Sequence, residues 1–412
     1  MASQNPFFHR GPISDPKYFF GRTAELRQLS ELLNAGQHLA IYGQRRTGKT
    51  SLLFQLKNQA AYMWQVAYID SGILDGLDDE WLYGAVDRAL GGEAEAITYP
   101  QFVNRLRELA QKNQRLILLL DEFELLGANP RLGNTFFNRL RGLATQYPLQ
   151  FVTASRAPLL QIAFAQPDTL SSPFFNIFAP LPLPLMNETE ASELLTTLSE
   201  QAGKKFTAQA IDFILRLVGT HPLFVQVAGY RVFGMAATAD MTGEEELKVR
   251  AAIESDLIQH LQYYWRHLSD EARYALITLP LGTSAALKEF LQAEGWLGMG
   301  EVGRRFVTQQ KVEGVRWAGE FLLDTRRGLV YAREKILRLT PTEFALMRLF
   351  IEHAGEVLSP EFIEKNLWPS EVSPDTERAR YAVKKLRAAL GEAGEALVNR
   401  RGVGWSLESV RI

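Results

Sequence analysis

A glycine-bounded loop of eight residues narrows the possible folds of this chain more than any other segment. The loop is Gly43-Gln-Arg-Arg-Thr-Gly-Lys-Thr50, and it lies between the apolar run His38–Tyr42 and a helix-like stretch with Leu52, Leu53 and Leu56. Glycines let a backbone wrap closely around phosphate groups, and amides at a helix N-terminus point at an anion. Because the spacing and both flanking elements agree, we predict a phosphate-binding loop.

The side chains of this loop predict how it binds a nucleotide. Lys49 supplies a positive charge for the β- and γ-phosphates, and the hydroxyl of Thr50 is placed to coordinate Mg²⁺. The sequence leaves open whether Arg45 and Arg46 contact the nucleotide. The nucleotide-binding residues predicted in this segment are Gly43, Gln44, Arg45, Arg46, Thr47, Gly48, Lys49, Thr50 and Ser51.

Two carboxylates follow a second strand-length apolar run. Leu116–Leu120 is followed directly by Asp121 and Glu122. We predict that Asp121 holds Mg²⁺, directly or through water, and that Glu122 polarises an attacking water. This makes the chain a candidate ATPase in which Lys49 and the two acids are catalytic, and its turnover is expected to be slow if its role is signalling. The competing interpretation, in which two acids merely end a strand at the surface, is weaker beside a phosphate-binding loop.

Short apolar strands alternate with helical stretches over residues 1–185. Strands are predicted at 38–42, 65–69, 116–120 and 150–154. This alternation favours a parallel sheet with helices on both faces, the α/β fold of a P-loop NTPase. The prolines of Leu181-Pro-Leu-Pro184 are expected to lie outside any helix or strand. Residues 186–267 are predicted to form a helical lid, and 268–314 a helical connector similar to a winged helix. Within the connector, a helical pair with a small strand is expected over 268–310.

Segments around the loop carry a family resemblance. Phe19-Phe-Gly-Arg22, the Asp-Glu strand and Phe151–Arg156 resemble the STAND and origin-recognition-related branches of the AAA+ P-loop ATPases, including the archaeal ATPase group, over about residues 19–234. The resemblance implies ATP or ADP and Mg²⁺ as cofactors. It also implies that Gly21 and Arg22 lie by the adenine and ribose. Ser155 would take the sensor position near the γ-phosphate, with Arg156 beside it.

The same resemblance extends to the lid and to one helix of the core. Gly219-Thr-His221-Pro222 resembles the Gly-x-Pro element of the family's lid. This implies that Pro222 packs near the base and that His221 senses the phosphates. Arg139 and Arg141 lie on the helix before the sensor strand, where related oligomeric ATPases often carry an arginine finger. A solvated or salt-bridged helix face explains these two arginines equally well.

The C-terminal segment combines three predicted helices with a basic hairpin. Thr340-Pro-Thr-Glu343 carries the signals of a helix start, Ser359-Pro360 opens a second helix, and a third runs from Thr376 to Leu390. Cations on the third helix and the hairpin suit phosphates and guanine edges of DNA, although a basic run alone would favour a solvated face. The DNA-binding residues predicted are Arg378, Arg380, Lys384, Lys385, Arg387, Arg400 and Arg401.

Taken together, Arg338–Phe344 and the wing Arg401-Gly-Val-Gly-Trp405 resemble the winged helix of OmpR-type response regulators, from about Val315 to residue 412. The resemblance implies an α+β winged-helix domain over 315–412 with double-stranded DNA as its partner. No phosphoacceptor receiver domain precedes it in this sequence, so the ATPase is the expected input. Ala382 stands where the family often places a larger polar residue, so the family's base preference does not transfer. A winged helix that binds protein is the alternative.

Composition excludes several other kinds of site. The 45 Lys and Arg against 47 Asp and Glu give a net charge of -2, which argues against a globally basic nucleic-acid coat but not against a locally basic element. Cysteine is absent and no histidine pair has a helical metal-ligand spacing, so thiolate and histidine metal sites are not expected. Without a signal peptide or a membrane-length apolar run, we expect a cytoplasmic protein with no membrane partner.

These features predict an ATP-binding and ATP-hydrolysing switch that controls DNA binding by its winged helix, as a STAND-like transcription regulator. Two alternatives stay open. The first is an oligomeric DNA-remodelling or DNA-loading AAA+ ATPase of the origin-recognition type. The second is a defence-type STAND sensor whose winged helix recruits a protein. Homo-oligomer formation on ATP or DNA is compatible with each of them.

Overall fold

The structure is a computed structural model that describes residues 5–7, 11–74, 76–164, 173–234, 243–333, 335–369 and 375–408. The chain divides into two compact units, the first formed by Met1–Leu257 with Gln292–Val302 and the second by Ile258–Leu291 with Gly303–Ile412. The four-part division expected from the sequence is finer than this, so its boundaries stay predictions. Within the described ranges, no helix has both the length and the apolar character to cross a bilayer.

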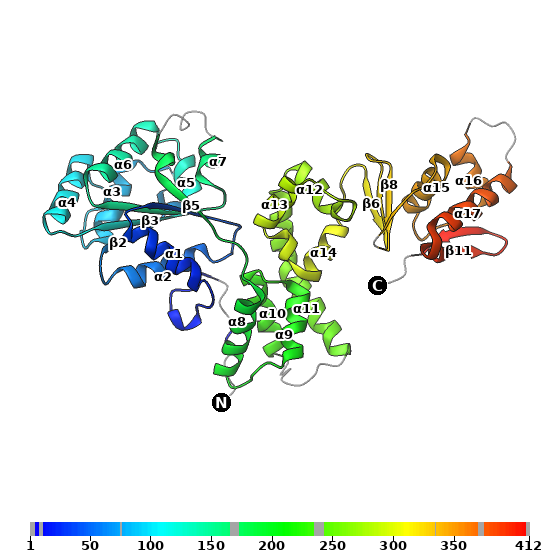
Figure 1. Ribbon diagram of the computed structural model, residues 1–412, viewed down its shortest axis with the longest axis horizontal. Coiled ribbons are helices and arrows are strands. Elements are labelled where there is room, and N and C mark those ends of the chain that lie inside the picture. Colours follow the sequence, from blue (N-terminus) through cyan, green and yellow to red (C-terminus); the bar gives the residue numbers. More distant parts are fainter. Residues whose placement is uncertain are drawn as a thin grey trace. The chain divides into compact units, whose positions relative to one another are not determined.

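The first unit contains a five-stranded sheet in which all neighbouring strands run parallel, in the order β2-β3-β4-β1-β5 (Figure 1). The strands are β1 (His38–Tyr42), β2 (Gln65–Asp70), β3 (Leu116–Asp121), β4 (Leu149–Ser155) and β5 (Phe178–Pro182). The predicted α/β fold class is confirmed, and four of these strands start or end within one residue of the predicted bounds.

The fifth strand corrects one expectation from the sequence. Pro180 and Pro182 both lie in β5, although the prolines of the 181–184 run are expected outside every strand. Among the described strands β5 pairs with β1 alone, so it is an edge strand whose other side carries no ladder. A proline without an N–H is tolerated at such an edge. The expectation is therefore wrong for Pro182.

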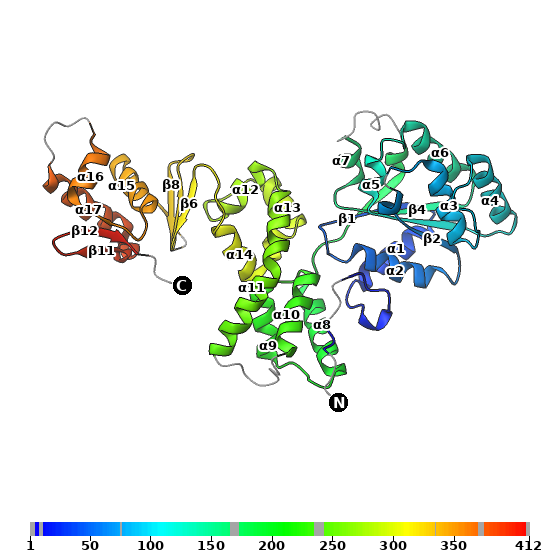
Figure 2. The same cartoon turned by 180° about the vertical axis from the view of Figure 1, so that it is seen from behind.

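Helices cover both faces of the sheet because its residues alternate between two apolar cores. On β3, Ile117 and Leu119 pack on one side, and Leu116, Leu118 and Leu120 pack on the other. Figures 1 and 2 show α1 and α2 on one face and α3 to α6 on the opposite face. The helices are α1 (Thr23–Asn34), α2 (Lys49–Ala60), α3 (Asp79–Ala89), α4 (Tyr99–Gln111), α5 (Phe123–Ala128), α6 (Asn134–Gln146) and α7 (Leu159–Phe164), with 3-10 turns η1 (Pro16–Tyr18), η2 (Ser71–Leu74) and η3 (Pro173–Ile177).

A helical lid follows the sheet in the same unit. Its helices are α8 (Glu188–Gln201), α9 (Ala208–Val218), α10 (Pro222–Gly234) and α11 (Gly243–Arg266), the last of which continues into the second unit. Phe7, from the segment before α1, is buried in this lid, where its ring stacks on Phe206 at 5.4 Å. Phe7 also lies against Gly229, at which an added Cβ would come within 2.7 Å of the ring.

Residues 292–302 also belong to the first unit, although the chain on both sides of them belongs to the second. They contain η5 (Trp296–Gly298) and the start of α14 (Gly300–Thr308). The amide of Thr220 donates to the carbonyl oxygen of Gly298 at 3.2 Å, and Arg250 of α11 pairs with Glu301 at 2.6 Å. A backbone hydrogen bond and an ion pair therefore hold this short segment against the lid.

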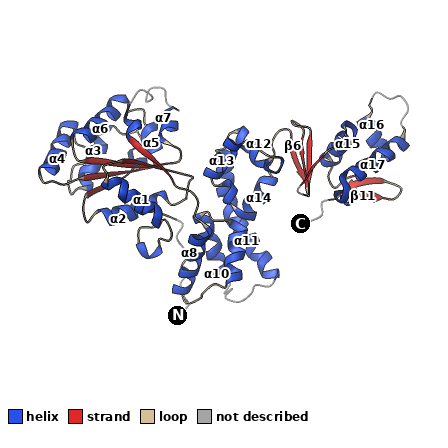
Figure 3. Ribbon diagram, viewed as in Figure 1, coloured by secondary structure: helices blue, strands red, loops and turns tan. Residues whose placement is uncertain are grey.

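The second unit combines helices with two small antiparallel sheets, drawn in red in Figure 3. Its first part contains α12 (Asp270–Ile277), η4 (Leu279–Leu281) and α13 (Ala285–Ala293), and the sheet β6 (Val315–Ala318), β7 (Phe321–Asp324), β8 (Leu329–Ala332) and β9 (Lys335–Leu337). The described residues of 268–314 contain helices but no strand, so the small strand expected in the connector is wrong.

The last part of the second unit has the α+β winged-helix architecture that the sequence predicts. It consists of α15 (Pro341–Glu352), β10 (Val357–Leu358), α16 (Pro360–Leu367), α17 (Thr376–Leu390), η6 (Gly391–Ala396), β11 (Leu397–Arg400) and β12 (Gly404–Leu407). The predicted capping box is present, since the Thr340 hydroxyl accepts from the Glu343 amide and the Glu343 carboxylate accepts from the Thr340 amide. Ala379, Val383 and Leu386 of α17 are buried against the other helices, as the helical spacing predicts.

Candidate nucleotide site and nucleic-acid interface

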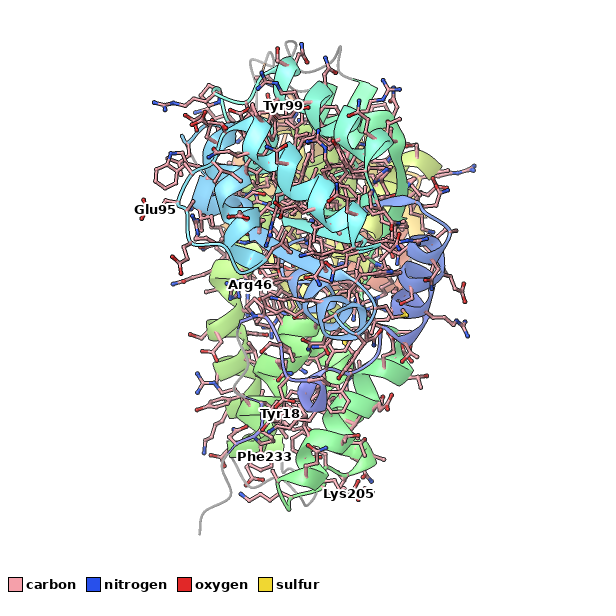
Figure 4. All side chains as sticks on the ribbon, turned by 90° about the vertical axis from the view of Figure 1, so that its left-hand side faces the viewer. Tyr18, Arg46, Glu95, Tyr99, Lys205 and Phe233 are labelled. Carbon is pink, nitrogen blue, oxygen red and sulfur yellow. The ribbon has the colours of Figure 1, made fainter. Side chains whose placement is uncertain are left out.

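A cleft of about 320 Å³ lies within the first unit, between the phosphate-binding loop and the lid. Stretches far apart in the sequence line it: the N-terminal segment, the loop, the ends of β3 and β4, and α8 and α10. Tyr18 and Arg46, both labelled in Figure 4, are among the lining residues. The predicted site residues that line the cleft are Arg22, Arg45, Arg46, Thr47, Gly48, Lys49, Thr50, Ser51, Asp121, Glu122, Ser155, Arg156 and Pro222.

The loop adopts the geometry that its glycines permit. Gly48 has φ 100 and caps the N-terminus of α2, so the first amides of that helix face the cleft. The Lys49 ammonium donates to the carbonyl oxygens of Gly43 at 2.7 Å and Gln44 at 2.8 Å. Burial lowers the pKa of Lys49 to about 8, although the nearby carboxylates of Glu124 and Asp121 oppose this. The loop therefore presents a partly desolvated cation beside a helix N-terminus.

The two carboxylates at the end of β3 have different environments. Asp121 is 3% exposed, and its oxygens accept from the Tyr68 hydroxyl at 2.9 Å and the Glu122 amide at 3.0 Å. Glu122 is exposed at the start of α5 and has φ 48. Asp121 and Thr50 line the same cleft and offer oxygen ligands, which is the donor set that Mg²⁺ prefers. The residues present therefore fit the predicted metal.

The end of β4 brings the predicted sensor residues to the same cleft. Ser155 is fully buried and its hydroxyl donates to the Ala157 carbonyl at 2.7 Å. Arg156 pairs with Glu124 at 3.2 Å, and burial raises the pKa of the Glu124 carboxyl. The sequence reasoning missed Glu124 and Tyr68. Glu124 could have been found as the second acid after β3, whereas Tyr68 reaches Asp121 only through the pairing of β2 with β3.

Arg22 ties the phosphate-binding loop to the start of the lid. It is 4% exposed and its guanidinium donates to the carbonyl oxygens of Thr47 at 3.3 Å and Pro184 at 2.6 Å. Gly21 does not line the cleft, but an added Cβ there would lie 2.9 Å from the Glu190 side chain. Of the five described non-glycine residues with positive φ, Arg22, Arg46 and Glu122 line the cleft. Such strained backbone tends to gather at functional sites.

The lid contributes one predicted residue and one that the sequence reasoning missed. Pro222 lines the cleft, together with Gln226 one turn further along α10. His221 is fully buried and its ring stacks on Phe224 at 4.4 Å, outside the residues that line the cleft. The structure therefore does not bring His221 to the cleft, and its phosphate-sensing role stays a prediction. The only available signal for Gln226 is its spacing of one helical turn from Pro222.

The two arginines of α6 lie away from the cleft of their own chain. Arg139 pairs with Asp79 at 3.0 Å and lies over the Tyr99 ring at 4.8 Å. Arg141 is exposed. The arginine finger therefore stays a prediction for either residue, and in this chain it could act only on a neighbouring molecule.

The basic residues of the winged helix form two groups in the structure. On α17 the side chains of Arg380, Lys384 and Lys385 are exposed, and Arg401 is exposed at the tip of the wing. Arg387 and Arg400 are exposed as well, but Arg387 donates to the Leu397 carbonyl and Arg400 pairs with Glu408. Arg378 lies over the Trp368 ring at 3.9 Å and pairs with Glu364 at 2.9 Å. Ala382, the departure from the OmpR-type pattern, is buried, and the neighbouring Tyr381 is exposed instead.

The fold and the cleft define a P-loop NTPase joined to a winged helix of the type that binds DNA. Residues 101–282 match the family model described as Novel STAND NTPase 2, and residues 333–407 match the one described as Transcriptional regulatory protein, C terminal. The chain thus carries a STAND-type NTPase domain and an OmpR-type winged-helix DNA-binding domain. The phosphate-binding loop precedes the first matched range, so its assignment depends on the motif and the geometry above.

Curated relatives match a short part of the chain. The Transcriptional regulatory protein CusR of Escherichia coli (strain K12) is 36% identical over 74 residues, which are 18% of this chain and 33% of CusR. The Phosphate regulon transcriptional regulatory protein PhoB of Rhizobium meliloti is 33% identical over 93 residues, 22% of this chain and 41% of PhoB. The chain therefore spans only about a third to two fifths of the length of these relatives.

Solved structures resemble the larger part of the chain. The Walker-type ATPase PABY2304 of Pyrococcus abyssi has a TM-score of 0.54 at 16% identity, covering 77% of this chain and 97% of that protein. The ORC2 protein of Aeropyrum pernix, in its ADPNP-ADP complexes, has a TM-score of 0.52 at 16% identity, covering 74% and 88%. At this identity the likeness shows the fold alone.

Proposed function

We propose that this protein is an ATP-dependent switch whose nucleotide state controls how its winged helix binds double-stranded DNA, as a transcription regulator in the cytoplasm. One observation carries the proposal: a single chain holds both a cleft with a phosphate-binding loop and a winged helix with exposed cations. The named relatives are transcriptional regulatory proteins, which supports the same output.

The cleft residues support ATP binding and slow hydrolysis. Lys49 and the amides at the start of α2 would hold the phosphates, while Thr50 and Asp121 would hold Mg²⁺. Bound there, the metal would neutralise negative charge on the phosphates. Glu122 is exposed at the cleft and is free of the hydrogen bonds that hold Asp121 in place, so it is suited to orient and polarise a water.

Residues 292–302 supply a physical route from the nucleotide to the second unit. An added Cβ at Gly295 would lie 2.6 Å from the Gln44 side chain, so this segment contacts the phosphate-binding loop itself. Gly298 and Glu301 of the same segment bind the lid. The chain on both sides of this segment belongs to the second unit. A movement of the loop or the lid on nucleotide binding would therefore displace the chain that leads into that unit.

The test is DNA selection from a random oligonucleotide pool with the full-length chain, performed with and without ATP and Mg²⁺. We expect a discrete target sequence whose affinity changes at least about fivefold with ATP, which is a coupling of ~1 kcal/mol. Lys49→Ala should lose this response because it no longer binds ATP. Glu122→Gln should keep the response and lose at least about 100-fold in turnover. No selective DNA binding in either nucleotide state would refute the regulator.

The second candidate is an oligomeric ATPase that remodels or loads onto DNA. The exposed side chain of Arg141, outside the cleft of its own chain, favours it, because a finger acting on a neighbour needs such a position. It predicts that DNA stimulates hydrolysis and that Arg141→Ala subunits inhibit wild-type subunits when the two are mixed. A regulator would instead show sequence-selective footprints and little stimulation by DNA.

A further inference from the structure

The side-chain amide of Gln226 is a buried polar group without a hydrogen-bond partner among the described residues. The residue is 4% exposed on α10, and neither its oxygen nor its nitrogen forms a hydrogen bond to any residue that the structure describes. Gln226 also lines the nucleotide cleft. An unsatisfied buried amide destabilises a fold, and native proteins retain few of them. An amide in this position is explained if a ligand supplies the missing donor and acceptor.

The surroundings of Gln226 indicate which part of a ligand it meets. Pro222 and Leu223 share its face of α10, at spacings of four and three residues, and line the cleft with it. Met186 and Leu194 add further apolar side chains from the start of the lid. This wall carries no cation, so it suits an uncharged, flat group rather than a phosphate. The cations of the cleft lie elsewhere: Arg22 precedes α1, Arg45, Arg46 and Lys49 belong to the loop, and Arg156 follows β4.

We propose that Gln226 recognises the adenine base of the bound nucleotide, an inference that depends on the proposed nucleotide binding. The Gln226 Oε1 accepts from the 6-amino group of adenine, and its Nε2 donates to the adjacent ring nitrogen N7. A glutamine amide offers one acceptor beside one donor, which matches this edge in both positions. Guanine presents two acceptors, O6 and N7, at the same edge, so the amide oxygen would face an acceptor there and lose its hydrogen bond.

The test compares wild type with Gln226→Met, which keeps the length of the side chain and removes both polar atoms. Affinities of the full-length chain are measured for ATP, GTP and inorganic tripolyphosphate, all with Mg²⁺. We expect wild type to prefer ATP over GTP at least about tenfold, the discrimination typical of a paired amide–base contact. In Gln226→Met that ratio should fall to near one through loss of ATP affinity, while tripolyphosphate binding stays the same.

A stability measurement separates ligand recognition from a structural role. Gln226 has no hydrogen bond to lose, so the unliganded Gln226→Met chain should melt at the wild-type temperature or above it. Gln150→Met is the matched control: Gln150 is also buried, but its amide donates to the carbonyl oxygens of Leu33 at 2.9 Å and Gln37 at 3.1 Å. That variant should melt at a lower temperature and keep the ATP preference.

Two results would overturn the assignment: an unchanged ATP-to-GTP ratio in Gln226→Met, or a wild-type chain without a preference. Neither depends on DNA. If the protein prefers ATP through Gln226 but its DNA affinity does not change with ATP, the proposed switch is refuted and the base-recognition site is still supported.

Discussion

The nucleotide cleft and the basic surface of the winged helix use charge in opposite ways. Two charged residues of the cleft are withdrawn from water: Asp121 is 3% exposed and Arg22 is 4% exposed, and protein atoms hold both. The lysines of α17, Lys384 and Lys385, are exposed on one helix. Burial makes the chemistry of the cleft sensitive to protonation, whereas exposed charge acts through an electrostatic field that salt screens. The two regions should therefore respond to different solution conditions.

The largest expected effect separates the two regions by salt. Lys384→Ala combined with Lys385→Ala should weaken DNA binding of the full-length chain by about tenfold or more. It should also reduce the slope of log affinity against log salt by roughly 2, because each lost phosphate contact releases about one counterion fewer. ATP affinity should stay the same. DNA titrations at several salt concentrations measure both quantities.

A matched control removes the same charge elsewhere. Lys57 and Lys112 are exposed lysines of the first unit, outside the winged helix. Replacing both by alanine should leave the salt slope within about 0.5 of the wild-type value, since neither lysine is expected to contact DNA. An equal loss of slope in the two double variants would show that net charge, rather than the surface of α17, drives DNA binding.

The next effect in size is the response of the cleft to pH. With a pKa of about 8, Lys49 is mostly protonated at pH 7 and mostly neutral at pH 9. Only the ammonium form attracts phosphate, so ATP affinity should fall roughly tenfold between these values. Lys49→Arg keeps its charge over this range and should show a much flatter profile. An identical decline in both proteins would mean that another group titrates.

Local patterns predicted the segments whose structure depends on neighbours in sequence. The loop and α2 follow from glycine spacing, and α15 follows from the capping residues Thr340 and Glu343, which bond to each other within one turn. The bounds of α17, from Thr376 to Leu390, were predictable because the apolar spacing and Gly391 mark both ends. In each case the interactions that determine the element lie within a few residues of it.

Features that depend on tertiary contacts were not predictable in this way. Whether a proline fits a strand depends on which strand lies at the edge of the sheet, and Pro182 lies in such an edge strand. Tyr68 reaches Asp121 only because β2 and β3 are neighbours, and Gln226 matters only because α10 lines the cleft. The sequence likewise does not show whether a basic side chain faces solvent or pairs within the domain. Arg378, for example, pairs with Glu364.

The smallest expected effect sharpens the contrast within one helix. Arg378 lies over Trp368 and pairs with Glu364, which is 2% exposed, whereas Arg380 is exposed and its guanidinium lies 3.5 Å from the Glu377 carboxylate. Arg378→Ala would leave a buried carboxylate unpaired, which should cost about 2 kcal/mol or more of local stability. Hydrogen exchange of α17 in the full-length chain would measure this as faster exchange. Arg380→Ala should leave exchange unchanged and weaken DNA binding, and equal effects of the two substitutions on exchange would contradict the division between inward and outward arginines.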